Sequence, residues 1–287
     1  MMSSDYPRFL SDDLPERSAS DCLFHLIPCP LERSVSYGEG TSAGPRAILE
    51  ASGQLEAYLE DGVPGDAGIH TAAAIDCSSD DVAGILSALG RRVVDLVAAN
   101  HIPLTLGGEH ALSSGPIAAL HRAGIDFGVV QFDAHADLRD AYEGNRHSHA
   151  SVMRRVTDLG VPLFQFGVRS LCGEEIQARM DNNVGSIDAR QLMTGATFSD
   201  LLPASFPKNI YLTFDIDVFD ASLMPATGTP EPGGLFWYDV VRVLEDVVRH
   251  RRVIAGDLVE LAPLANFHGP SFTAAKAAYQ IIRVAQR

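Results

Sequence analysis

The segment FGVVQFDAHAD (127–137) indicates both how the chain folds and where its functional site lies. Residues 127–132 form an apolar run that is typical of a buried strand. Asp133, His135 and Asp137 follow at alternate positions, and alternate side chains of an extended chain point the same way. A carboxylate placed directly after a core strand is costly unless it is paired or bound to a metal. We therefore interpret this segment as a strand that delivers metal ligands to one site.

Two further segments repeat the arrangement. The apolar run IPLTL (102–106) is followed by GGEH, which contains His110, and IYLTF (210–214) is followed by Asp215 and Asp217. A lone histidine or a lone Asp-x-Asp pair is more often structural, but the three clusters together favour one shared site. Four aspartates at strand ends would repel one another unless cations lay between them, and two divalent ions would balance four carboxylates. The pattern predicts a binuclear metal centre, and such centres mostly catalyse hydrolysis.

Strand-like and helix-like segments alternate along the chain, which predicts an α/β fold. We expect a single three-layer α/β/α domain with a mainly parallel central sheet, formed by residues 21–287, and a polar N-terminal arm over residues 1–20. In such folds, sites lie beyond the carboxyl ends of the strands. The expected strands are 22–28, 102–106, 127–132, 162–168, 210–216 and 253–261, and the expected helices are 44–59, 80–99, 113–122, 149–159, 237–250 and 271–285.

Composition restricts the function classes. The 287 residues are 21% charged and 46% hydrophobic, which is typical of a soluble globular protein. A net charge of −15 argues against nucleic acid and anionic membrane partners, and is compatible with a cationic substrate, although most acidic proteins are merely soluble. No apolar run is long enough to span a membrane, and the N-terminus does not resemble a secretory signal. The four cysteines lack a CxxC spacing and are expected to be reduced thiols of a cytoplasmic protein: Cys22, Cys29, Cys77 and Cys172.

Several motifs together resemble the ureohydrolase family, which includes arginase and agmatinase. They occur in the family's order and cover about residues 20–285: SVSYGEGTSAGPRAIL (34–49), GGEH, FDAHAD, SHASVMRR (148–155), FDID, ATGTPEPGG (226–234) and DLVEL (257–261). The resemblance implies an α/β/α fold, two Mn2+ per subunit and a homotrimer or homohexamer. It also implies hydrolysis of a guanidino group to urea and an amine.

The resemblance assigns the six candidate ligands to three pairs. These are the terminal ligands of one manganese, the terminal ligands of the other, and the bridging carboxylates; in that order the pairs are His110 with Asp137, His135 with Asp217, and Asp133 with Asp215. Oxygen-rich ligands suit manganese, but zinc or cobalt could also occupy such a site. Manganese therefore follows from the resemblance and not from the ligand set.

Three residues are expected to be catalytic. Taken alone, His149 could be a helix cap or a surface residue, but its match to the family's Ser-His-Ala segment implies a proton shuttle for the departing amine. Glu260 could be an ordinary strand-end residue, but the resemblance implies that it accepts hydrogen bonds from the substrate guanidinium. Asp137 would accept a hydrogen bond from the attacking water. Asp257 is expected to be structural or to support the site residues, and Glu231 is a candidate for such support.

The loop over residues 138–147 is predicted to meet the substrate tail. Its sequence DLRDAYEG, with the later SHASVMRR, resembles agmatinase and departs from the arginase pattern. Agmatine carries an ammonium tail, which Asp140, Glu143 and Asn145 are predicted to bind. The expected reaction is therefore agmatine to putrescine and urea, a step of polyamine biosynthesis.

Other functions remain open at this stage. Arg139 and Arg146 lie in the same loop and could equally pair with a substrate carboxylate, which would make the protein a guanidinobutyrase or another guanidino-acid hydrolase. Arginase activity is less favoured by the loop. A non-catalytic family member is a further alternative, although the intact set of ligands argues against it.

Overall fold

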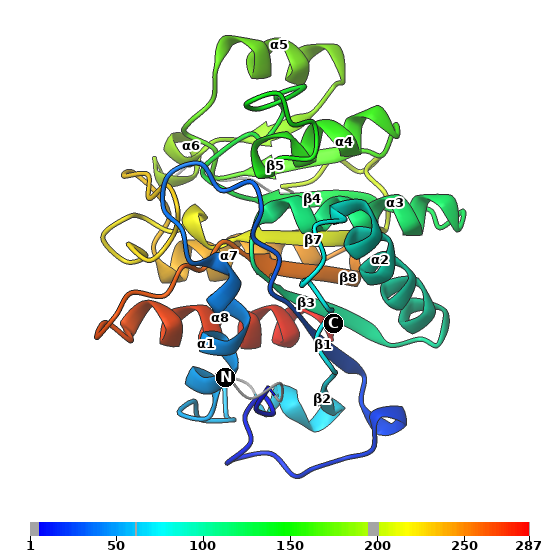
Figure 1. The fold of residues 1–287 in the computed structure, drawn as a ribbon, viewed down its shortest axis with the longest axis vertical. Helices are drawn as coiled ribbons and strands as arrows, with labels where there is room; N and C mark the ends of the chain where they lie inside the picture. Colours follow the sequence, from blue (N-terminus) through cyan, green and yellow to red (C-terminus); the bar gives the residue numbers. More distant parts are fainter. Residues whose placement is uncertain (1–5, 61, 195–200, 287) are drawn as a thin grey trace.

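An eight-stranded parallel sheet forms the middle layer of the molecule (Figure 1). The computed structural model describes residues 6–60, 62–194 and 201–286. The strand order is β2-β1-β3-β8-β7-β4-β5-β6, and all paired neighbours are parallel. The strands are β1 (Phe24–Cys29), β2 (Ile69–Thr71), β3 (Ile102–Gly107), β4 (Gly128–Phe132), β5 (Leu163–Phe166), β6 (Gly185–Ile187), β7 (Asn209–Asp215) and β8 (Arg252–Val259).

Helices cover both faces of this sheet. One face carries α1 (Gly44–Ser52), α7 (Trp237–Val248), α8 (Gly269–Ala285) and the short α6 (Ala189–Met193). The other carries α2 (Val82–Ala98), α3 (Ser114–Arg122), α4 (Val152–Asp158) and α5 (Gly173–Asp181). Short 3-10 turns are η1 (Ala19–Asp21), η2 (Thr41–Ala43), η3 (Pro64–Ala67), η4 (His110–Ser113), η5 (His149–Ser151) and η6 (Ile216–Val218). The predicted three-layer α/β/α fold is confirmed.

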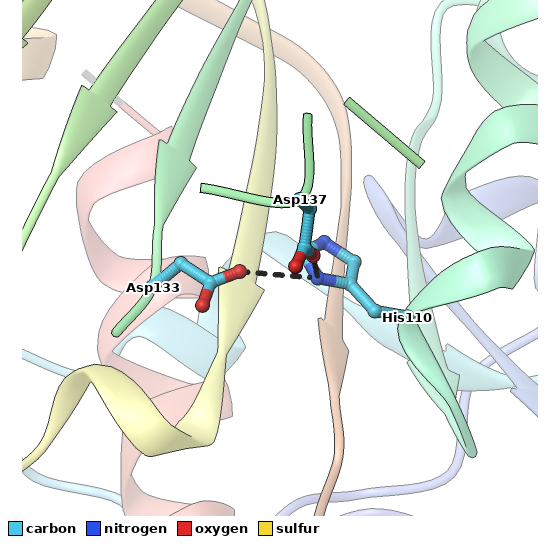
Figure 2. Close-up of side chains that lie close together, drawn as sticks. All are labelled: His110, Asp133 and Asp137. Atoms are coloured by element: carbon cyan, nitrogen blue, oxygen red, sulfur yellow. Dashed lines mark ion pairs between the residues drawn. The ribbon is translucent and has the colours of Figure 1, made fainter. Parts of the chain in front are cut away.

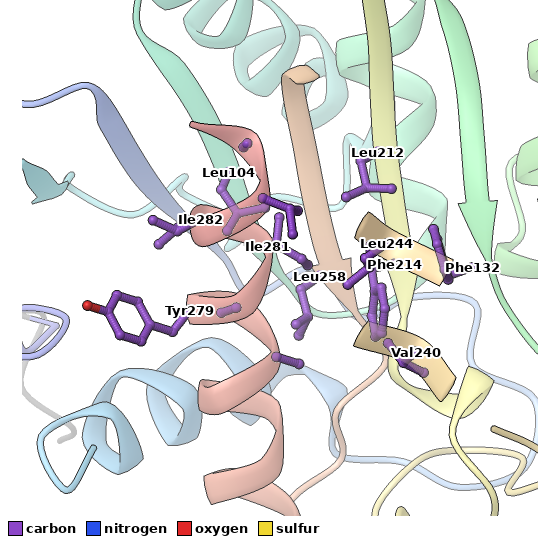
Figure 3. Close-up of a cluster of buried hydrophobic side chains, with 14 of the residues drawn as sticks. Leu104, Phe132, Leu212, Phe214, Val240, Leu244, Leu258, Tyr279, Ile281 and Ile282 are labelled. Carbon is purple, nitrogen blue, oxygen red and sulfur yellow. The ribbon is translucent and has the colours of Figure 1, made fainter. Parts of the chain in front are cut away.

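Two hydrophobic cores lie on opposite sides of the sheet. Leu212 and Phe214 of β7 belong to the core beneath α7 and α8, whereas Tyr211 belongs to the core beneath α2 and α3. Figure 3 shows the first core, where Ile281 of α8 and Leu244 of α7 pack against the strands. Because strand side chains alternate between faces, burial on both faces requires apolar residues at consecutive positions. This is why the central strands appear in the sequence as continuous apolar runs.

The predicted elements are all present, and most of their ends lie within three residues of the prediction, but one end was wrong by more and four elements were not predicted. The helix expected over 44–59 ends at Ser52, because Gly53 is a poor helix former and the chain turns there. The elements β2, β6, α5 and α6 were missed. The two strands have three residues each, and such segments are too short to show a periodic pattern.

The described part of the predicted N-terminal arm packs against this same chain. Phe9 and Leu10 are buried. The Phe9 amide donates to the Thr71 hydroxyl at 3.0 Å, and the Leu10 amide donates to the Ser52 hydroxyl at 3.0 Å. The division of the chain at residue 20 stays a prediction.

Among the residues that the structure describes, no helix combines the length and the apolarity needed to cross a membrane.

Candidate metal centre and active site

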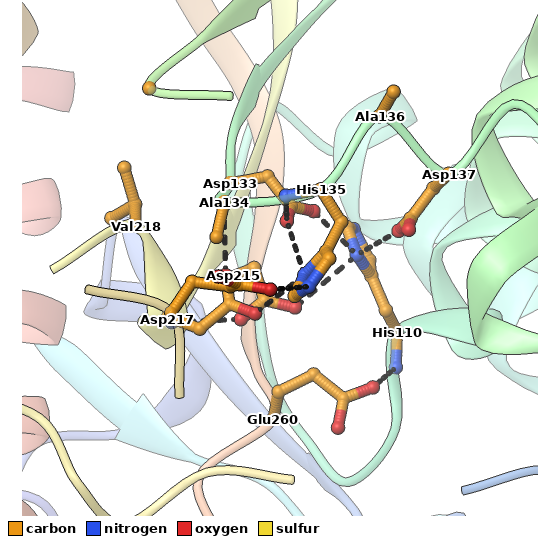
Figure 4. A network of polar contacts seen from close by, with 12 residues as sticks. His110, Asp133, Ala134, His135, Ala136, Asp137, Asp215, Asp217, Val218 and Glu260 are labelled. Carbon is orange, nitrogen blue, oxygen red and sulfur yellow. Dashed lines mark hydrogen bonds and ion pairs between the residues drawn. The ribbon is translucent and has the colours of Figure 1, made fainter. Parts of the chain in front are cut away.

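The candidate site lies at the carboxyl ends of four adjacent central strands. In sheet order these are β3, β8, β7 and β4, which lead into His110, Glu260, Asp215 and Asp133 respectively. Because parallel strands end at the same edge, residues far apart in the sequence meet there. Figure 4 shows these side chains pointing toward one another from their separate strands.

His110 forms the first group of close side chains (Figure 2). Its Nδ1 lies 2.9 Å from Asp137 Oδ2, 3.2 Å from Asp133 Oδ2 and 3.5 Å from Asp215 Oδ2. All four side chains are at least nine-tenths buried. One histidine nitrogen therefore faces three carboxylates in the protein interior.

His135 forms the second group. Its Nδ1 lies 2.9 Å from Asp217 Oδ2 and 3.6 Å from Asp133 Oδ1. Asp133 belongs to both groups, and its two oxygens face different histidines. Glu231, from the loop after β7, places a carboxylate oxygen 3.9 Å from His135 Nε2. The site thus consists of two neighbouring clusters of metal-ligating side chains that share one carboxylate.

Hydrogen bonds determine which His110 nitrogen is free. The Thr213 hydroxyl donates its one proton to Asp257 Oδ1 at 2.6 Å, so it accepts from His110 Nε2 at 2.8 Å. Asp257 also accepts from the Tyr211 hydroxyl at 2.6 Å. A neutral His110 therefore carries its proton on Nε2 and directs the Nδ1 lone pair at the carboxylates. Within the described residues Nδ1 has no hydrogen-bond partner.

A lone pair that faces carboxylates is repulsive unless a proton or a cation lies between them. Burial lowers the pKa of His110, but the close carboxylates of Asp133 and Asp137 outweigh burial and raise this pKa well above its usual value. Positive charge between His110 Nδ1 and the carboxylates would therefore stabilise the site. A divalent cation supplies it and leaves the imidazole neutral, as a metal ligand must be. The residues present fit a metal centre.

The raised pKa values of the site acids also indicate that the site favours bound cations. Burial, followed by the charge of Asp133, raises the pKa of Asp137 to about 7. Burial raises the pKa of Asp215 well above its usual value, and the charges of Asp217 and Asp133 add to this. Burial, with the charges of Glu109 and Asp217, raises the pKa of Glu260 to about 8. The negative charge at the site therefore exceeds what its two histidines balance.

A chain of amides orients Asp133 and was not singled out in the sequence. Gln131 Nε2 donates to Asp133 Oδ2 at 2.6 Å, and Gln165 Nε2 donates to Gln131 Oε1 at 2.5 Å. Arg179 Nε in turn donates to Gln165 Oε1 at 2.8 Å. Gln131 and Gln165 are partners on adjacent strands β4 and β5. A polar residue inside an apolar strand was the signal that could have identified both.

Two of the site acids have an unusual backbone conformation. Asp137 has φ 52° and Glu260 has φ 65°, in the left-handed region that non-glycine residues rarely adopt. Such conformations cost free energy and persist where the surrounding structure imposes them, often at functional sites.

His149 lies beside the metal ligands in a cavity of about 270 Å3. Its backbone amide donates to the Ser34 hydroxyl at 3.0 Å, and its Nε2 lies 3.4 Å from the Ser36 hydroxyl. Burial lowers its pKa, so the ring is neutral at neutral pH. Ser34 and Ser36 were not singled out in the sequence, since hydroxyl residues of a loop carry no distinct pattern. Glu260, which is predicted to bind the guanidinium, lines the same cavity.

The residues predicted to bind the substrate tail lie outside this lining, as far as the chain is described. Asp140 Oδ1 accepts from both Arg146 and Arg155 at 2.9 Å. Asn145 uses its side-chain oxygen to accept from a backbone amide two residues later at 2.9 Å, and Glu143 is exposed. Their tail-binding role stays a prediction.

Two other residues of the 138–147 loop do line the cavity. The Arg139 guanidinium lies 5.4 Å from the centre of the Tyr142 ring, in cation–π geometry. The Tyr142 ring in turn meets the His149 ring edge-on, with centroids 6.0 Å apart.

Two histidines and four aspartates gathered at the carboxyl edge of a parallel sheet are typical of metal-dependent hydrolases with an α/β fold. Comparison with known proteins narrows this class. The model of the arginase family matches residues 23–284, so the chain belongs to the arginase family. The predicted ureohydrolase resemblance is confirmed, and the protein is a hydrolase of this family.

Similar proteins share most of their length with this chain. It is 38% identical to an N(1)-aminopropylagmatine ureohydrolase of Synechocystis sp., over 92% of this chain and 90% of that protein. It is 33% identical to an agmatinase of Pyrococcus horikoshii, over 96% of both chains. The crystal structure of agmatine ureohydrolase of Thermoplasma volcanium has a TM-score of 0.81 at 28% identity, and the match covers 94% of this chain and 92% of that one.

Proposed function

We propose that this protein hydrolyses the guanidino group of agmatine to give urea and putrescine, with two Mn2+ ions per subunit. The observation that carries the proposal is the pair of histidine–aspartate clusters that share Asp133, with Glu260 and His149 in the same cavity. Relatives at 38% and 33% identity are named for the hydrolysis of agmatine-type compounds, which supports the choice of substrate.

A metal pair held here would acidify water and so supply hydroxide at neutral pH. The residues proposed to hold it are His110, Asp133, His135, Asp137, Asp215 and Asp217. Because its two oxygens face different histidines, Asp133 would contribute to holding both ions.

Glu260 positions the guanidinium. One of its oxygens accepts from the His110 amide at 2.6 Å, which fixes the carboxylate, while the other is available to the substrate. A carboxylate and a planar guanidinium form directional, charge-assisted hydrogen bonds. The approach of a cationic substrate lowers the pKa of Glu260 from its raised value and thereby favours the ionised carboxylate.

Proton movement falls to Asp137 and His149. Asp137 accepts a hydrogen bond from the attacking water, and His149 carries a proton to the amine as the C–N bond breaks. The Ser36 hydroxyl near His149 Nε2 supports this role, because it keeps the ring oriented toward the cavity.

The test is urea release from a panel of guanidines in the presence of manganese. The panel contains agmatine, N(1)-aminopropylagmatine, arginine, guanidinobutyrate and guanidinopropionate. We expect the highest kcat/KM for agmatine. A preference for arginine would contradict the proposal, and bound metal without turnover of any guanidine would indicate a non-catalytic family member.

A guanidino acid is the second candidate substrate, and Arg139 favours it. This residue lines the cavity and forms no ion pair among the described residues, so its guanidinium is available to a substrate carboxylate. Arg139→Gln distinguishes the candidates: it would lower kcat/KM for guanidinobutyrate but not for agmatine.

We further propose a cytoplasmic homotrimer or homohexamer. The family resemblance supports the assembly, and the four free cysteines support a reducing compartment such as the cytoplasm. Light scattering coupled to size-exclusion chromatography measures the assembly, and a monomer would contradict it.

A further inference from the structure

Two cysteines that have no role in the proposed reaction lie close together. They lie near residues 33–38, part of which lines the catalytic cavity. Cys29 is the last residue of β1, and residues 72–75 run alongside this strand. The Ala72 amide donates to Leu26 O at 2.8 Å, and the Ile75 amide donates to Pro28 O at 2.9 Å. Two residues later, Cys77 places its Sγ 3.9 Å from Cys29 Sγ. A disulfide requires about 2.05 Å, so a shift of about 2 Å would bring the sulfurs to bonding distance.

The environments of the two thiols differ. Cys29 is fully buried, whereas Cys77 is partly exposed. The hydrogen bond from Cys29 and then the nearby Arg33 charge lower the pKa of Cys77. The same contact and burial raise the pKa of Cys29. A partly exposed thiol beside a buried thiol is the arrangement of a reacting cysteine and its resolving partner.

We propose that Cys29 and Cys77 form an oxidation site, at which a low-molecular-weight disulfide converts the two thiols into an intramolecular disulfide. The Cys77 thiolate attacks one sulfur of the oxidant, forming a mixed disulfide and releasing one thiolate. Cys29 then loses its proton and attacks Cys77 Sγ, which releases the second small thiol. The protein loses two electrons and two protons, and the oxidant is reduced to two thiols.

The site is connected to the catalytic cavity by the chain that follows β1. The Arg33 guanidinium donates to Cys77 O at 2.8 Å, and the Arg33 and Ser34 amides both donate to buried Glu109 Oε2, at 2.7 and 2.6 Å. The next four residues, 35–38, line the cavity. Because Ser34 also accepts from the His149 amide, movement of this segment displaces His149 from its position.

Oxidation should therefore lower turnover while the metal ligands, which lie on other segments, remain in place. A misplacement of about 1 Å near the reacting atoms can cost up to 10²-fold, so we expect a loss on the order of tenfold that a reducing agent reverses.

The experiment treats the metal-loaded protein with oxidised glutathione, followed by intact-mass measurement and peptide mapping. The Cys172→Ser variant serves as background, because Cys172 lines the cavity and could react directly. We expect a product lighter by two hydrogens, with peptides containing Cys29 and Cys77 joined. A stable glutathione adduct on Cys77, or no reaction at Cys77, would overturn the proposal.

Two further variants separate the steps. Cys29→Ala should trap glutathione on Cys77, and Cys77→Ser should leave Cys29 unreacted, with urea release insensitive to the oxidant in both. The disulfide is detected by mass, so its formation is judged independently of the proposed substrate. Formation of the bond without any change in urea release would confirm the oxidation site and refute its connection to the cavity.

Discussion

At the residue scale, the structure explains why a single hydroxyl matters to the proposed metal centre. Thr213 lies on β7, between two strands that carry site residues. Its hydroxyl oxygen accepts a hydrogen bond from His110 Nε2, and its hydroxyl proton is donated to Asp257. Nothing in the run IYLTF distinguishes this threonine from any other β-branched strand residue. Its importance comes only from its neighbours in the sheet.

Replacing Thr213 tests this contact. Thr213→Val removes the acceptor for His110 and leaves Asp257 with one hydrogen bond fewer. We expect affinity for the metal held by His110 to fall about 10- to 100-fold, as for other groups that orient metal ligands, with less effect on the second ion. Isothermal titration of the metal-free protein with manganese measures both.

Thr105→Val provides the matched control. Thr105 is a buried strand residue on β3 whose hydroxyl has no partner in the described structure. Its replacement should leave metal affinity unchanged and not lower stability, because an unsatisfied hydroxyl is removed. Equal losses of metal affinity in both variants would show that any change in the core disturbs the site.

His149 carries the second prediction at this scale. His149→Ala should retain both metals but lose about 10²–10⁴ in turnover, because it removes the proposed proton carrier. Metal content by mass spectrometry and urea release are the measurements. The exposed His147, two residues earlier, is the control, and His147→Ala should keep near-normal activity. An emptied metal site in His149→Ala would refute the shuttle role.

At the element scale, β1 places His25 where protonation of its ring is unfavourable. His25 is buried, and its ring centroid lies 4.4 Å from His101 and 5.2 Å from His70. Burial, with the charges of these two histidines, lowers its pKa from 6.5 to about 4. The unfolded chain therefore binds a proton at a higher pH than the folded one.

The stability of the fold should consequently fall as the pH drops from about 6.5 to about 4. Above this range His25 is neutral in both states, and below it the loss is complete, at about 1–3 kcal/mol. Urea denaturation at several pH values measures this, with His25→Gln expected to reduce the slope. His121→Gln, an exposed change on α3, should keep the full slope. Identical slopes in all three proteins would exclude His25 as the cause.

Prediction from the sequence succeeded for the long apolar strands and failed for the three-residue strands and for α5, a nine-residue helix that buries only Glu175 and Ala178. The continuous apolar runs of the central strands identified β3, β4, β7 and β8, and their carboxyl ends located the site. The three-residue strand β2 carries too few residues for any pattern, although it pairs with β1 over its whole length. Likewise, Gln131 and Thr213 became recognisable only through contacts between neighbouring strands. Local sequence encodes an element, but contacts across a sheet depend on strand order.

At the scale of the whole molecule, the site concentrates buried negative charge between the two cores. Four aspartates and Glu260 lie within this region, and burial raises the pKa of three of these acids. Bound cations should therefore stabilise the folded state, in addition to their proposed role in the reaction.

Removing the metal should lower the free energy of unfolding. Ligand that binds only the folded state contributes about 2.7 kcal/mol at a concentration 100 times its Kd. We expect dialysis against a chelator to lower the Tm and added manganese to restore it in a concentration-dependent way. Calorimetry with and without metal is the measurement, and magnesium, which prefers more water ligands, is the control. An unchanged Tm after complete metal loss would show that the site is not coupled to folding.

The position of β8 in the sheet has a consequence for protein synthesis. This strand is made next to last among the main elements, yet it lies between β3 and β7 and delivers Glu260. A nascent chain that has not yet emerged from the ribosome through residue 260 cannot join the two halves of the sheet. Metal capture would thus follow the synthesis of β8, and a chain truncated before β8 should emerge without a binding site, however complete its set of ligands.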